Sequence, residues 1–186
     1  MIILDILSYF ATFPARSAVD VLFTRGESKF PEYDILRNAL RSNPTDPILP
    51  EVEGFVFGQS LDKVLPALDR ISGTYLFVDF GECSAHRDFT NSINDTFAVA
   101  VTIASKIADF SDLAETAIIT DRTLSLMSRM TGQLIADSEE RYDIFRSRMV
   151  NYTIAPFTSP ELKSIGWTIS FQLAGFDSLQ VSERNR

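Results

Sequence analysis

The sequence predicts an α+β fold of two layers. A mostly antiparallel sheet is covered on one face by a long helix, and a helical or extended arm precedes it. Residues 96–104 (TFAVAVTIA) alternate between bulky apolar and small side chains, as a strand does when one of its faces packs in a core. Residues 74–80 (TYLFVDF) are mostly apolar on both faces, which indicates a central strand. From residue 111 to residue 136, apolar residues recur at every third or fourth position, which is typical of an amphipathic helix.

The composition fits a single soluble globular domain with an appended arm. The chain has 186 residues, of which 45% are hydrophobic and 23% charged, and fifteen of them are Phe, so it can bury a sizeable core. The net charge is −8. Proteins that bind nucleic acids gain most of their affinity from Lys and Arg, so we expect no nucleic-acid partner.

The cysteine count and the N-terminal residues bear on the compartment. Cys83 is the only cysteine, so no intrachain disulfide can form, and a reducing cytoplasm is expected. No apolar run approaches the roughly 20 residues of a membrane helix. The apolar run at residues 1–10 is interrupted by Asp5 and has no basic residue before it, so it predicts a short buried helix and not a signal peptide.

Residues 1–50 differ in pattern from the rest and are predicted to form the arm. After a first helix that closes near Pro14, residues 18–23 predict a strand, and a second helix is expected from Pro31. Three prolines within residues 44–50 predict a stiff, extended connector. This connector either packs on its own chain or carries the arm to a neighbouring subunit.

Residues 51–186 are predicted to form the α+β core domain. Residues 55–57 read as a short edge strand, and Ser60 as the N-cap of a helix that runs to about Ser72 in spite of Pro66. Residues 81–95 are expected to form a long loop or a loose hairpin.

The second half of this domain begins with the long helix at 111–136, which Asp109 or Ser111 is expected to cap. Residues 139–148 look helical, either as a further helix or as a continuation of the long one. Residues 150–155 look extended, and the tail at 181–186 is expected to be frayed. The apolar stripe of the long helix is predicted to comprise Leu113, Ala117, Leu124, Met127, Met130 and Leu134.

A last strand is expected over 166–173, after a loop bracketed by Pro156 and Pro160. Its even-numbered positions are small or polar, like those of the strand at 96–104. A flat face of such residues lets a second layer approach closely, either a helix or a neighbouring subunit. The predicted interface residues are Ala98, Ala100, Thr102, Thr168, Ser170 and Gln172.

Chemistry-bearing residues are sparse in this sequence. His86 is the only histidine, and its spacing from Cys83 in a loop does not fix a catalytic dyad. Asp79, Glu82, His86 and Asp88 are the candidates for an oxygen-rich site for a divalent cation. No zinc-type spacing and no glycine-rich phosphate loop is present in the sequence, so we expect no cofactor and no catalytic residue.

The order of the elements resembles the tail terminator and tail-completion proteins of tailed phages. The resemblance covers about residues 60–175: the helix at 60–72, the strands at 75–80 and 97–103, the long helix and the strand at 166–171. It is one of element order, without an invariant motif, and residues 1–50 have no counterpart in it. It implies a non-catalytic subunit that closes the tail tube as a ring, with a hexamer expected. The implied partners are further copies and other tail or assembly proteins, and the implied location is the bacterial cytoplasm or the virion, often from a prophage.

Two further functions stay open at this stage. One is a small metal-binding or hydrolytic enzyme that uses the acidic loop with His86. The other is a monomeric ligand-binding domain with an apolar pocket between helix and sheet.

Overall fold

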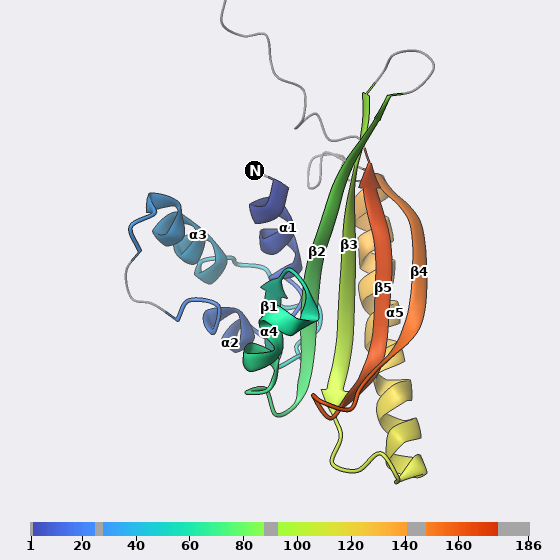
Figure 1. Ribbon diagram of the computed structural model, residues 1–186. Helices are drawn as coiled ribbons and strands as arrows, with labels where there is room; N and C mark the ends of the chain where they lie inside the picture. The colour runs from blue at the N-terminus through green and yellow to red at the C-terminus, as the bar shows by residue number, and fades with distance from the viewer. Residues whose placement is uncertain (1, 25–27, 88–92, 141–147, 175–186) are drawn as a thin grey trace, which may run out of the picture.

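In the computed structural model, the described part of the chain forms one five-stranded sheet and five helices (Figure 1). The structure describes residues 2–24, 28–87, 93–140 and 148–174. The strand order is β1-β2-β3-β5-β4, with β1 parallel to β2 and every other pair antiparallel. The strands are β1 (Gly54–Gly58), β2 (Thr74–Arg87), β3 (Ile93–Lys106), β4 (Arg148–Ser159) and β5 (Ser164–Ala174). The helices are α1 (Ile2–Phe10), α2 (Arg16–Asp20), α3 (Pro31–Arg41), α4 (Leu61–Leu68) and α5 (Leu113–Glu140). The predicted fold class, a mostly antiparallel α+β sheet with a long helix, is confirmed.

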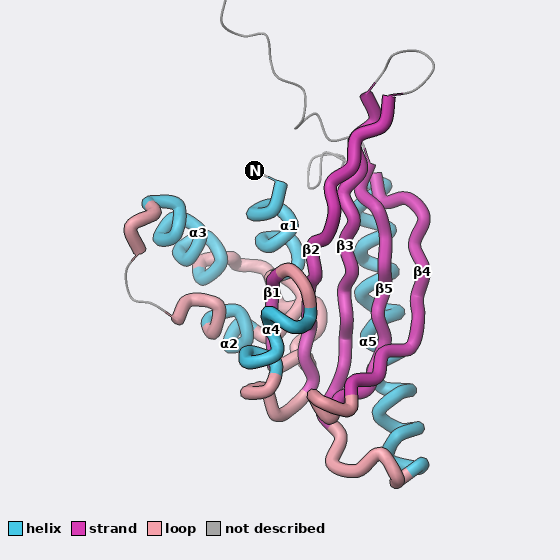
Figure 2. The backbone as a smooth tube through the Cα atoms, in the orientation of Figure 1, coloured by secondary structure: helices cyan, strands magenta, loops and turns pink. Residues whose placement is uncertain are grey.

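The bulky face of the sheet carries the main core. The core-facing residues of β3 pair with those of β5, for example Val101 with Ile169 and Val99 with Phe171. Helix α5 lies across this face (Figure 2) and contributes Met127, among others, to the same cluster. The alternation of bulky and small residues in β3 and β5 therefore serves the purpose that the sequence predicted, which is to bury one face of each strand.

The described residues before β1, which are 2–24 and 28–52, pack on the same core as the sheet. Phe10, Phe13 and Leu49 are fully buried in the main cluster. The proline-containing connector is fixed by a backbone hydrogen bond of 2.7 Å from the Leu49 N–H to the Phe13 carbonyl oxygen. Arg129 of α5 also holds it, since its guanidinium donates to the Ile48 carbonyl oxygen at 2.9 Å and to the neighbouring Glu51 carboxylate at 2.7 Å. Of the two alternatives for the connector, local packing on its own chain is the one observed.

The other face of the sheet is covered only near one end. There α4 and the β4–β5 turn close a second, smaller cluster, which contains Val56, Leu68, Tyr75, Phe77, Ala104 and Leu162. Among the described residues, no helix covers the rest of this face, which Figure 1 shows on the side away from α5.

Three expectations for the chain before β2 were wrong. Residues 18–23 do not form a strand, because Arg16–Asp20 is the short helix α2, which buries the consecutive residues Ala18 and Val19. Helix α4 ends at Leu68 and not near Ser72. Ser60 precedes α4 but makes no side-chain cap, since its φ is 66° and its backbone N–H donates to Asp79 instead.

The strands are longer than the sequence indicated. Strands β2 and β3 continue through most of the segment expected to be a loop, as far as Arg87 and from Ile93. Pro156 lies inside β4 and not in a loop. Strand β4 is at the sheet edge, where a residue without a backbone N–H is tolerated.

In its N-terminal half, α5 buries a different face from the predicted apolar stripe. Leu113 is 78% exposed, and Ala117 and Leu124 are also exposed, whereas Thr123 is buried along with Met127. The cap is Asp112, whose carboxylate accepts the backbone N–H groups of Ala114 and Glu115 at 3.0 Å each. The predictions for 141–147 and for the tail at 181–186 lie outside the described residues.

Candidate functional site

The six predicted interface residues are brought together as three cross-strand pairs. The register of β3 and β5 places Ala98 opposite Gln172, Ala100 opposite Ser170, and Thr102 opposite Thr168. All six side chains therefore belong to the face of the sheet opposite α5. The sequence offered the small-residue face of 96–104 and the polar face of 166–173 as separate candidate surfaces. The register of β3 and β5 joins them into one face, because residues two apart on a strand point the same way.

Part of this face is closed and part is open. Thr102 is 5% exposed, and its hydroxyl shares a hydrogen bond of 2.7 Å with that of Thr168, so this end is not available for contact with another molecule. Ser170 and Gln172 are exposed, and Ala98 and Ala100 are half-buried. We call these four residues, together with Thr153 of β4, the open face.

A shallow hollow of about 420 Å³ lies in the open face. Strands β2, β3, β5 and β4 line it in that order, with Asp79 and Gly81 contributed by β2. Strand β4 contributes Thr153, and also Asn151, which has a φ of 51° at the irregularity between Val150 and Thr153. The sequence prediction missed both β4 residues, although their odd-numbered spacing in an expected extended segment was the signal that could have found them.

The candidate metal ligands are described only in part. Asp79 sits at the margin of the open face, where its carboxylate accepts the Ser60 backbone N–H at 3.0 Å. Glu82 is exposed and lies in an irregularity of β2 between Phe80 and Cys83. The side chain of His86 and the whole of Asp88 lie outside the described residues. Within the part of the chain that the structure describes, no group of three His, Cys, Asp or Glu residues is placed to hold a metal ion.

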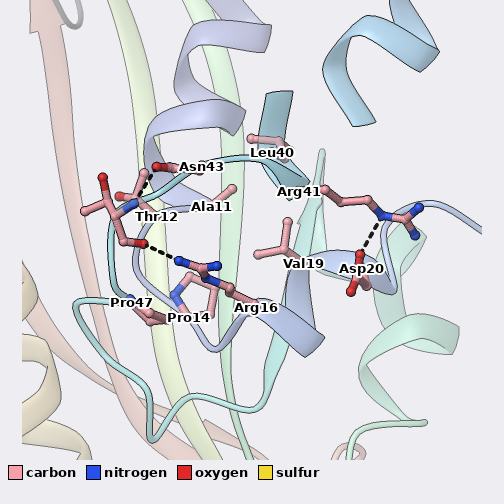
Figure 3. Close-up of a pocket in the computed structure, with 11 residues that line it drawn as sticks. Ala11, Thr12, Pro14, Arg16, Val19, Asp20, Leu40, Arg41, Asn43 and Pro47 are labelled. Carbon is pink, nitrogen blue, oxygen red and sulfur yellow. Dashed lines mark hydrogen bonds and ion pairs between the residues drawn. The ribbon is translucent and has the colours of Figure 1, made fainter. Parts of the chain in front are cut away.

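A second, more polar hollow of about 220 Å³ lies between α2, the end of α3 and the connector (Figure 3). Its charged groups are bound within the fold: Arg41 Nε lies 2.7 Å from the Asp20 carboxylate, and Arg16 donates to the Thr45 backbone carbonyl oxygen at 3.2 Å. These contacts join α2 to α3 and to the connector. We assign this hollow a structural role.

A third hollow, of about 460 Å³, follows the edge of β1. All five residues of the segment from Glu53 to Phe57 line it, and its two walls come from α2 and from α4 with the turn after it. Most of its wall residues are apolar, including Val21, Leu22 and Val64. The sequence prediction missed this groove because it placed a strand where α2 forms one of the walls.

The described helices and the comparisons with known proteins add two findings. None of the helices in the described ranges is both long enough and apolar enough to cross a membrane. No family model matches this sequence, and no curated protein matches it either.

Proposed function

We propose that this protein is a non-catalytic assembly subunit whose copies join through the open face. The phage resemblance suggests the setting, in which a ring, expected to be a hexamer, closes the end of a tail tube together with other tail proteins. The observation that carries the proposal is the open face itself: four central positions of a long sheet bear Ala, Ser or Gln and have no covering element among the described residues.

Small side chains favour this role for a physical reason. A strand face of Ala and Ser leaves the backbone within reach of an approaching surface, and its side chains lose little conformational freedom when they are buried. A head-to-tail ring also requires that each copy present two different surfaces. The open face is one of these two surfaces.

The proposal is tested by placing a charge on the open face. Ser170 is exposed at its centre, so Ser170→Arg leaves the core intact but puts a long cation into the proposed contact. Ser125→Arg is the matched control, because Ser125 is exposed on α5, on the opposite side of the sheet. Sedimentation velocity should show self-association of wild type and of Ser125→Arg. It should show association at least about tenfold weaker for Ser170→Arg, since an unpaired charge at an interface costs more than about 1.4 kcal/mol.

Equal association of the two variants would place the contact elsewhere. Circular dichroism spectra and melting temperatures of both variants establish that the fold is unchanged.

A further inference from the structure

The groove beside β1 is an unpaired strand edge set between two apolar walls. Strand β1 is an edge strand of the sheet and pairs only with β2 among the described residues. Alternate backbone N–H and C=O groups of β1 therefore point into the groove, and no described residue pairs with them. Val21, on the α2 wall, is 69% exposed, although it is a large apolar side chain.

The opposite edge of the same sheet is protected. Strand β4 carries Pro156, which lacks an N–H, and an irregularity between Val150 and Thr153. Both are devices that prevent a sheet edge from pairing with another strand. Strand β1 has neither feature. The two edges of this sheet therefore differ in the way expected if β1 pairs with an added strand and β4 does not.

The chemistry of the groove favours an extended peptide over an apolar small molecule. An apolar ligand would cover the backbone groups of β1 without pairing them, and each unpaired buried group costs about 1–3 kcal/mol. An added strand supplies both the backbone hydrogen bonds and apolar side chains for the walls.

We propose that the segment 175–186 of a second copy of this chain binds in this groove as a strand added to β1. The proposal rests on the assembly function above and deepens it, because it names one of the two contacts between copies. The segment follows β5 directly and lies outside the described residues. Its sequence carries Leu179 and Val181, two positions apart, so an extended chain presents both to the same wall.

The register of the sheet favours a second copy over the same chain. Ala174, the last residue of β5, pairs with Thr96 of β3. Gly58 of β1 is aligned, through β2, with Ala100 of β3. Gly58 is therefore offset from Ala174 by four residues along the strands and by three strands across the sheet. That separation is roughly 20 Å, so a chain crossing it would use about six extended residues before reaching the groove. Leu179 would then lie outside the groove. A segment from another copy has no such constraint.

The test mixes two full-length variants that each lose one half of the contact. Val21→Glu places a charge on the groove wall, and the double variant Leu179→Glu, Val181→Glu does so on the segment. We expect each variant alone to lose the wild-type oligomer in sedimentation velocity. An equimolar mixture should form 1:1 pairs, because one partner retains the groove and the other retains the segment. Ile118→Glu, at a large apolar residue of α5 that is 54% exposed, is the control and should keep the wild-type oligomer.

The outcomes separate this inference from the assembly function. If both half-variants keep the wild-type mass while Ser170→Arg loses it, the inference is wrong and the assembly function stands. If wild type is a monomer, a labelled peptide of residues 175–186 decides the inference alone. Binding to wild type that is at least tenfold weaker for Val21→Glu supports it, and no binding, or equal binding to both, overturns it.

Discussion

Tyr75 is the residue whose chemistry the fold changes most clearly. It lies in the smaller cluster under α4 with none of its surface exposed, and this burial raises the pKa of its phenol. The hydroxyl therefore stays neutral in the folded protein at a pH where it ionises in the unfolded chain.

This shift predicts a loss of stability in alkali. The folded-state pKa of Tyr75 is raised above the unfolded value of 10.0, so its contribution is complete below pH 10 and is lost as the pH rises through the folded pKa. The free energy of unfolding, measured in urea at pH 8 and at pH 10.5, should fall less between these two pH values for Tyr75→Phe than for wild type. Tyr152→Phe, at a half-exposed edge position, is the control and should behave as wild type does. If Tyr75→Phe loses as much stability as wild type, this account of the buried phenol is wrong.

Single residues also show the limits of prediction from sequence. The open-face residues of β3 and β5 were predicted from the sequence, because alternation along a strand can be read directly from neighbouring residues, whereas Thr153 of β4 was missed. Asp112 was not, because Asp109, Ser111 and Asp112 are all ordinary cap residues and differ only in where the first helical turn begins. The residue pattern therefore predicts which face of a strand or helix a residue lies on more reliably than it predicts where a helix begins.

Among the elements, the pair β3–β5 depends on one close approach. Gly166 lies opposite Ala104, and a Cβ at Gly166 would lie 2.6 Å from the Ala104 Cα and would also overlap the Ile103 carbonyl oxygen. Both are main-chain atoms, which cannot move aside without shifting the strand. The β3–β5 pair therefore requires glycine at position 166.

We expect Gly166→Ala to lower the free energy of unfolding by about 2–3 kcal/mol, as overpacking of a core does. Gly132→Ala is the matched control. A Cβ there has nothing within 4 Å, and the position is exposed in α5, so alanine should stabilise the protein by about 0.5–1 kcal/mol. Urea denaturation measures both. Changes of the same sign in the two variants would contradict the packing described for β3 and β5.

At the level of elements, long periodic segments were predictable and short ones were not. The strands β3 and β5 and the helix α5 each repeat their pattern over many residues. Helix α2 has five residues, and its side chains, Ala18 and Val19 among them, suit either a strand or a helix until the core beside them is known. Tertiary packing decided its conformation.

For the whole molecule, the core is continuous from α1 to β5. Phe13 lies before the connector, yet it is fully buried in the same cluster as Val101 and Ile169 of the sheet. The sequence could not show this, because the division at residue 50 rested on a change of pattern along the chain, and a change of pattern carries no information on contacts between distant segments.

This continuity predicts that the N-terminal residues stabilise the whole fold. Phe13→Ala should lower the free energy of unfolding by about 3–5 kcal/mol. Unfolding should remain a single transition that is no broader than in wild type, because the one core unfolds cooperatively. Phe30→Ala is the control. Its ring is 60% exposed, and the change should cost less than about 0.5 kcal/mol. A separate early transition in Phe13→Ala, with the sheet melting at the wild-type temperature, would mean that residues 1–50 fold on their own.

The claim that this protein works by assembling through the open face is tested most directly by the native mass of the purified full-length chain, measured by native mass spectrometry over a wide range of concentrations. The account predicts one discrete closed oligomer for wild type, which is lost in Ser170→Arg and kept in Ser125→Arg. A wild-type protein that stays a monomer at the highest concentrations, or an oligomer that Ser170→Arg leaves intact, would contradict it.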